Sequence, residues 1–95
     1  MSAYVIFDID VTDPDGYKEY AKLAPATVAS YGGRYLARGG ANETLEGDWH
    51  AKRLVILEFA DVDKAKAWLN SSEYAPARKL RQQYAKSKAV VVEGV

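Results

Sequence analysis

The sequence contains no cysteine, which excludes disulfide bonds, thiolate metal sites and a cysteine nucleophile. It has a single histidine, His50, so no cluster of imidazole ligands is available and we expect no metal site. Its 13 basic residues are balanced by 13 acidic residues. Because nucleic-acid-binding domains usually carry a clear basic excess, we expect no nucleic-acid partner.

Long apolar segments are also missing. The longest apolar run is about five residues, whereas a membrane-spanning helix needs roughly 20. The chain begins Met-Ser-Ala-Tyr-Val and lacks the charged region and apolar stretch of a signal peptide. We therefore expect a cytoplasmic protein that does not associate with membranes.

What the sequence does contain is the composition of a globular protein. Hydrophobic residues make up 48% and charged residues 27% of the chain, which argues against disorder. A length of 95 residues corresponds to one domain. We treat residues 1–95 as a single domain with a modest core.

The periodicity of apolar residues predicts an α+β fold. Alternation with a period of two predicts strands at 3–11, 34–38, 53–59 and 89–95. Spacings of three and four predict helices at 14–31, 62–69 and 72–84, the first with a kink or break near Leu23 because Pro25 lies inside it. The order βαββαβ is typical of the ferredoxin-like fold, in which four antiparallel strands carry the helices on one face.

Three of the predicted strands are apolar on both faces. In strand 3–11, Tyr4 and Ile6 lie opposite Val5 and Phe7, and strands 53–59 and 89–95 show the same pattern. Leaving one of these faces in water would cost a large part of a small domain's stability. We therefore expect a homodimer packed sheet to sheet. The alternative is that the polar segment 42–49, a possible short hairpin arm, covers this face, or that the face forms a lightly exposed edge.

A series of short motifs runs through nearly the whole chain: Tyr17-x-x-Tyr20, Tyr31-Gly32-Gly33-Arg34-Tyr35-Leu36, Ala37-Arg38-Gly39-Gly40, Leu45-Glu46-Gly47-Asp48-Trp49, Arg53 to Phe59, Ala67-Trp68, and Ser72-Glu73-Tyr74 followed by Arg78 and Arg81. In this order and spacing, the chain resembles the uncharacterised family called domain of unknown function 1330, in the dimeric α+β barrel superfamily. The resemblance implies a ferredoxin-like protomer and a dimer whose sheets face each other around a cavity. It implies no reaction, since the superfamily includes cofactor-free monooxygenases, haem-degrading enzymes, isomerases, chlorite dismutases and ligand-sensing domains.

Charged residues inside apolar strands are the sharpest candidates for a site. Asp8, Arg38 and Glu58 each follow apolar residues on one face of a predicted strand, and Arg38 is expected to share its face with Leu36. Because a buried charge is costly unless paired, we expect Arg38 to contact Glu58 or Asp8. One interpretation is a site in which Arg38 binds an anionic ligand and a carboxylate of raised pKa acts as a base. The other is an ion pair that fixes strand register or the dimer.

The only histidine is a further candidate. His50 is a potential general base or haem ligand, although a solvated loop histidine is the simpler interpretation. Together, the candidate catalytic residues are Glu58, Asp8 and His50, and the candidate ligand-binding residues are Arg38, Tyr17, Tyr20 and Arg53.

Several aromatic and basic residues on the predicted helices are explained without a functional site. Tyr17, Tyr20, Trp68 and Tyr74 are expected mainly in the core, with tyrosine hydroxyls reaching a ligand as the alternative. Arg78 and Arg81 are expected to form a solvated basic patch near a helix C-terminus.

These observations favour a homodimeric protein that binds a small molecule. The interpretation includes a cofactor-independent enzyme acting on a small anionic or aromatic metabolite in a cavity between the sheet and the helices. The alternative is a non-catalytic ligand-sensing domain or a structural dimerisation module. No cofactor is expected in either case, because only His50 is available as an axial haem ligand.

Overall fold

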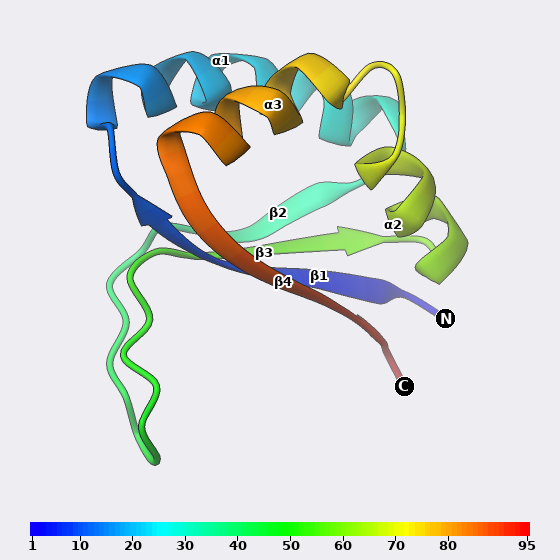
Figure 1. The fold of residues 1–95 in the computed structure, drawn as a ribbon. Coiled ribbons are helices and arrows are strands. Elements are labelled where there is room, and N and C mark those ends of the chain that lie inside the picture. The colour runs from blue at the N-terminus through cyan, green and yellow to red at the C-terminus, as the bar shows by residue number, and fades with distance from the viewer.

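The chain forms a four-stranded antiparallel sheet with its helices on one face (Figure 1). The computed structural model describes all 95 residues. The sheet has the order β2-β3-β1-β4, as the ferredoxin-like prediction requires. Its elements are β1 (Ala3–Val11), α1 (Pro14–Ser30), β2 (Arg34–Arg38), β3 (Leu54–Phe59), α2 (Val62–Leu69), α3 (Ala75–Tyr84) and β4 (Ala85–Glu93). None of the helices is long and apolar enough to cross a lipid bilayer.

Helix α1 begins at a capped N-terminus and continues through a proline. The Asp13 side chain accepts a hydrogen bond from the amide of Gly16, and Pro14 occupies the first turn, where no backbone donor is needed. The break predicted near Leu23 does not occur, because α1 runs from Pro14 to Ser30 across Pro25. Pro25 removes one backbone hydrogen bond, and the packing of α1 on the sheet offsets that loss.

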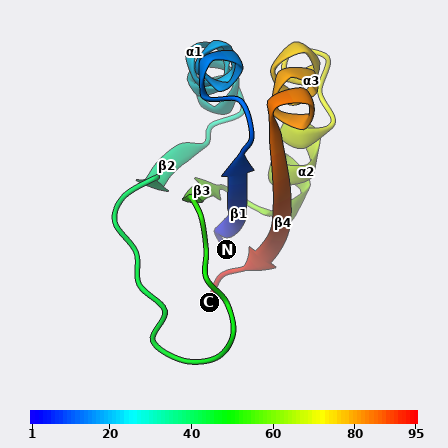
Figure 2. The same ribbon diagram turned by 60° about the vertical axis from the view of Figure 1, so that its left-hand side comes forward.

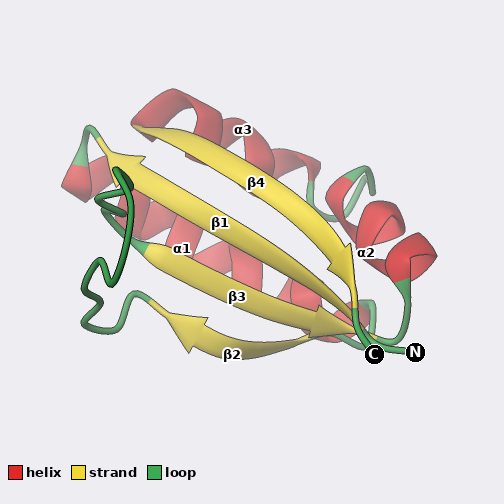
Figure 3. Ribbon diagram, turned by 90° about the horizontal axis from the view of Figure 1, so that it is seen from below, coloured by secondary structure: helices red, strands yellow, loops and turns green.

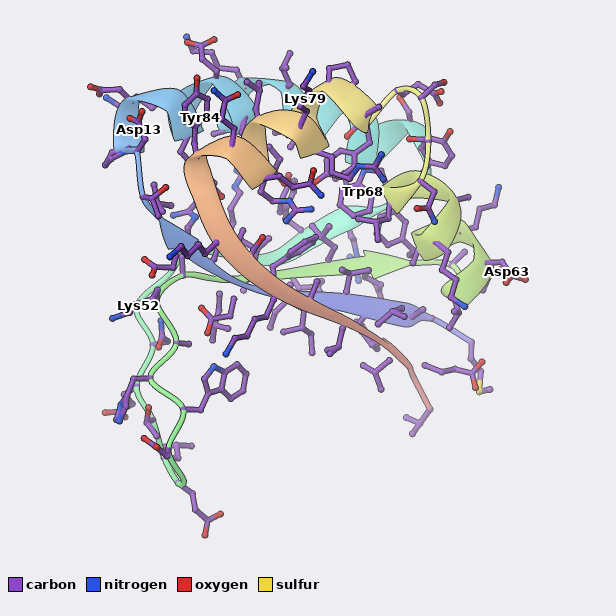
Figure 4. All side chains as sticks on the ribbon, in the orientation of Figure 1. Asp13, Lys52, Asp63, Trp68, Lys79 and Tyr84 are labelled. Atoms are coloured by element: carbon purple, nitrogen blue, oxygen red, sulfur yellow. The ribbon has the colours of Figure 1, made fainter.

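The core lies between the helices and the sheet. Trp68 is fully buried there, as predicted, between α2 and the sheet (Figure 4). Its ring centroid lies 5.4 Å from that of Phe59 and 4.2 Å from that of Tyr74. Its indole N–H donates to the Thr27 hydroxyl at 3.1 Å, so the one polar atom of the side chain is satisfied.

Strand β4 begins at Ala85, four residues earlier than the sequence predicts. Helix α3 ends at Tyr84 and the chain becomes extended at the next residue, without a loop. The Tyr84 carbonyl accepts the amides of Thr12 and Asp13, which joins this junction to the end of β1. The sequence does not predict the beginning of β4, because residues 86–88 are polar and show no apolar alternation.

The sheet face opposite the helices carries no helix (Figure 3), and large apolar side chains of three strands meet on it. We call it the outer face. Ile6 stands opposite both Ile56 and Val90 in the strand register, and Tyr4 stands opposite Val92. Val90 is 60% exposed, although it is a large hydrophobic side chain.

A long connection between β2 and β3, residues 39–53, extends away from the helices on the side of the outer face (Figures 1 and 2). We call this segment the arm. The hairpin predicted for it is absent, since none of its residues belongs to a strand. The Trp49 indole N–H donates to the Asp8 carboxylate at 2.9 Å, so one arm residue is tied to the end of β1.

Candidate ligand-binding cavity

An irregularity in β2 determines which way Arg38 points. The register with β3 pairs Tyr35 with Leu57 and Arg38 with Val55, and it shifts at Leu36 between them. This β-bulge puts Arg38 and Tyr35 on the same face of the sheet, together with the buried residues of β3. The prediction that Arg38 shares a face with Leu36 is therefore wrong, because it assumed unbroken alternation.

Arg38 faces a cavity of about 260 Å³ between α1 and the β2–β3 half of the sheet. All four candidate ligand-binding residues meet there, contributed by α1, by β2 and by the end of the arm. The carbonyl of Arg53 accepts the amide of Ile9 at 2.9 Å, which fixes the backbone from which the Arg53 side chain enters. The lining residues are Tyr17, Tyr20, Ala21, Ala24, Pro25, Tyr35, Arg38, Arg53 and Val55.

The cavity contains two cations and no anion. The Arg38 guanidinium lies 4.4 Å from the centre of the Tyr35 ring, and the Arg53 guanidinium lies 5.7 Å from the centre of the Tyr17 ring. None of the lining residues is an aspartate or a glutamate. The Nε atom of Arg53 is buried and has no hydrogen-bond partner. A buried donor without an acceptor is costly.

The three tyrosines of the cavity are hydrogen-bond donors at neutral pH. Burial raises the pKa of Tyr17, Tyr20 and Tyr35, because it disfavours the phenolate. The neighbouring guanidiniums of Arg53 and Arg38 act in the opposite direction on Tyr17 and Tyr35 but do not reverse the effect. The charged groups of the cavity are thus arginines, and its hydroxyls stay protonated. A ligand must supply acceptors.

The carboxylates that the sequence offers as bases lie elsewhere. Glu58 pairs with Arg34, whose Nε is 2.6 Å from its carboxylate, and this hydrogen bond holds the pKa of Glu58 below its usual value. Asp8 accepts from Trp49 and, at 3.0 Å, from the amide of Lys52. The hydrogen bond from Trp49 is the main cause that lowers the pKa of Asp8.

The pairing predicted for Arg38 with Glu58 or Asp8 is therefore wrong. So is the expectation that one of these carboxylates has a raised pKa. Both carboxylates point to the outer face, and their partners come from β2 and from the arm.

His50 lies on the arm and does not line the cavity. Its side chain is 78% exposed, and its Nε2 atom is 3.6 Å from the Asp48 carboxylate. No cluster of three potential metal ligands occurs in the chain. The imidazole is thus separated from the arginines and tyrosines of the cavity.

Sequence reasoning missed two residues that shape this region. Tyr35 enters the cavity beside Arg38 only because of the bulge, for which the sequence gives no signal. Arg81 was expected in a solvated patch, but it is only 8% exposed and its guanidinium lies 5.1 Å from the centre of the Phe7 ring. Its spacing from Tyr74 and Ala77 places it on the buried stripe of α3, and that spacing is a signal that could have found it.

Comparison with protein families identifies the chain. The model of the family described as "Domain of unknown function (DUF1330)" matches residues 2–95, so the chain belongs to this family. A search of curated proteins finds no match.

Solved structures support the same fold. A protein of unknown function from Rhodopseudomonas palustris is similar with a TM-score of 0.76 at 19% identity, over 99% of this chain and 82% of the other. A dimeric ferredoxin-like protein of unknown function from Jannaschia sp. CCS1 gives 0.72 at 13% identity, over 99% and 100% of the two chains. SnoaB, a cofactor-independent oxygenase from Streptomyces nogalater, gives 0.59 at 12% identity, over 99% and 93%. At these identities the likeness establishes the ferredoxin-like fold.

Proposed function

We propose that the protein is a homodimer that binds a small planar anion in the cavity between α1 and the sheet. The observation that carries the proposal is the presence of Arg38 and Arg53 in a cavity with no carboxylate. Guanidiniums bind carboxylates and other oxyanions through paired N–H donors, and they do so most strongly where water is partly excluded. Arg53 lines the same cavity as Arg38, and no carboxylate of the protein pairs with either guanidinium.

The shape of the cavity favours a small flat ligand. Its volume of about 260 Å³ is close to the lower limit of ordinary ligand pockets. The rings of Tyr17, Tyr20 and Tyr35 supply aromatic surface on which a planar group stacks. A small aromatic or conjugated acid matches both the charge and the surface.

A cofactor-independent reaction on the bound anion is the second candidate. Guanidiniums and neutral tyrosine hydroxyls stabilise negative charge that develops on oxygen, which is a large contribution in many enzymes. No histidine, aspartate or glutamate lines the cavity, so one protomer supplies no conventional base there. We therefore favour ligand binding, for example in a sensing domain, over catalysis as the function of the cavity.

The homodimer is proposed from the outer face. Tyr4, Ile6, Ile56, Val90 and Val92 form a contiguous apolar set on three neighbouring strands. Several structural relatives, including that from Jannaschia, are described as dimeric. A second copy packed on this face buries these side chains, each contributing about 1.5–3 kcal/mol when fully removed from water.

The protein is expected to be a dimer in solution, and Val90→Lys is expected to weaken it. Val90 is 60% exposed in one protomer, so the charge is tolerated by the fold but not by a sheet-to-sheet interface. Light scattering at micromolar concentration should give about twice the 10.5 kDa of one chain for the parent protein and less for the variant. Leu23→Lys, at a 46% exposed position of α1, is the control that should remain dimeric. A parent protein that is monomeric and folded contradicts the proposal.

Arg38→Met is expected to weaken anion binding by about 1.5–3 kcal/mol, the contribution of a charged hydrogen bond. Methionine keeps much of the apolar stem and removes the guanidinium. Titration calorimetry with a panel of small aromatic and aliphatic carboxylates measures the loss. The control is Arg34→Met, which removes an arginine from the same strand but from the outer face, where it contacts Glu58.

The proposed function fails if the parent protein binds none of these anions. It also fails if Arg38→Met and Arg34→Met bind them as tightly as the parent.

A further inference from the structure

A buried chain of polar groups leads from α3 to the cavity. The Nε atom of Arg81 donates to the Tyr74 hydroxyl at 3.3 Å, and the Tyr74 and Tyr20 hydroxyls are 2.9 Å apart. Tyr74 is fully buried, and Arg81 and Tyr20 are each 8% exposed. Of the three, only Tyr20 lines the cavity.

The chemistry of the donors fixes the direction of this chain. An arginine can only donate, so the Tyr74 oxygen accepts from Arg81 and its proton must find another acceptor. The Tyr20 oxygen is the acceptor within reach. If Tyr20 instead donated to Tyr74, the Tyr74 proton would be stranded in the core, which is costly. The favoured order is Arg81 to Tyr74 to Tyr20, which leaves the Tyr20 proton free.

Arg81 adds a positive charge that no carboxylate balances. Arg81 makes no salt bridge. Besides the Nε donation to Tyr74, its Nη1 atom donates to the Ser87 hydroxyl. Its guanidinium lies against the Phe7 ring in the core, where charges are weakly screened. A cation at the start of a hydrogen-bond chain polarises each member, so the last hydroxyl becomes a stronger donor.

We infer that Tyr20 is the oxyanion donor of the cavity, oriented by Tyr74 and Arg81 as positioning residues, and that the ligand class is a conjugated oxyanion, a phenolate or an enolate. This inference rests on the proposed function, because it names which oxygen of the bound anion is recognised and by what. Arg38 and Arg53 neutralise the charge, and the Tyr20 hydroxyl donates to the oxygen that carries it. A site of this kind binds the ionised form of a phenol in preference to the neutral form.

The state of Tyr20 is consistent with a donor. Burial is the largest cause that raises its pKa, because it disfavours the phenolate. The group therefore stays protonated through the neutral range and does not serve as a base. Arg81 lowers the pKa of Tyr20, but by less than burial raises it.

The test uses 4-nitrophenol, whose phenolate is coloured, with the parent protein and three variants. The parent is expected to bind the phenolate and to lower the apparent pKa of the bound phenol. Tyr20→Phe should weaken phenolate binding about tenfold or more, as expected for the loss of a hydrogen bond to a charged group. Tyr74→Phe keeps the Tyr20 proton but breaks the link to Arg81, so its loss should be smaller. Tyr31→Phe, whose exposed hydroxyl donates to Glu73, is the control and should match the parent.

A second measurement needs no variant. In the parent protein, the NMR signal of the Tyr20 hydroxyl proton should move downfield when 4-nitrophenolate is added, because the proton then enters a short hydrogen bond to a charged oxygen. An unchanged signal overturns the inference. So does a result in which Tyr20→Phe binds 4-nitrophenolate as tightly as the parent and Arg38→Met binds it more weakly. Either result leaves the proposed function standing. A parent protein that binds neither 4-nitrophenolate nor small carboxylates overturns both.

Discussion

Replacing Trp68 with alanine is expected to cost about 3–5 kcal/mol of the free energy of unfolding, the usual range for truncating a fully buried tryptophan. The side chain has no exposed surface and lies between α2 and the sheet, with Thr27 of α1 as its hydrogen-bond partner. Its ring contacts Phe7, Phe59 and Tyr74, with centroids 6.2, 5.4 and 4.2 Å away. The truncation also leaves the Thr27 hydroxyl without its indole partner. A loss of this size is a large part of a small domain's stability.

Denaturant unfolding followed by far-ultraviolet circular dichroism measures this loss without relying on tryptophan fluorescence. Protein concentration must be held constant, since the stability of a dimer depends on it. The matched control is Trp49→Ala on the arm, where the ring is 54% exposed and donates one hydrogen bond to Asp8. Its cost should be well below that of Trp68→Ala. Equal costs for the two variants would mean that the core is not organised around Trp68.

The pattern of apolar residues was enough to predict the sheet and its helices. Strands β1 and β3 are buried on one face by the helices, so alternation in residues such as Val5, Phe7 and Ile9 is a direct consequence of burial. The same logic fails where burial does not set the pattern. Strand β4 starts with polar residues, and the β2 bulge adds a residue that no periodicity marks.

The candidate site was only partly accessible from the sequence, for a related reason. Tyr17 and Tyr20 are three residues apart on one helix, so their proximity follows from helix geometry. Arg38 and Arg53 are 15 residues apart in the sequence. Both line the cavity because the arm brings the chain back beside β2. The charge pattern within single strands could not reveal that Glu58 is already paired with Arg34.

Hydrogen-bond partners from other segments also explain why Arg81 is buried. Arg81 was expected in solvent because lysine and arginine near a helix end usually are solvated. Its hydrogen-bond partners, the Tyr74 hydroxyl and the Ser87 hydroxyl, lie in the turn before α3 and in β4. Only the assembled fold brings them to one side of the guanidinium.

The base of the arm connects the fold to the cavity through Gly39. This residue has φ +70°, a conformation that costs other residues about 1–3 kcal/mol. Its amide donates to the carbonyl of Leu54 at 2.8 Å, which fixes its position beside β3. A Cβ atom at Gly39 would lie 2.5 Å from Cζ of Arg53, so the guanidinium occupies the space that the missing side chain leaves. Glycine is therefore required here both by the backbone and by the arginine.

Gly39→Val is expected to reduce stability by about 1–3 kcal/mol and to weaken anion binding by a further 1.5–3 kcal/mol. The stability loss comes from the positive φ, which a β-branched residue tolerates poorly. The binding loss arises because the guanidinium, at the flexible end of Arg53, moves away more easily than the backbone does. Thermal unfolding and calorimetric titration with a small aromatic carboxylate separate the two effects. Gly40→Val is the matched control, since no atom lies within 4 Å of its added Cβ and its φ is not positive. If Gly39→Val loses stability but binds the anion like the control, then Arg53 does not contact the ligand and Arg38 alone carries the charge recognition.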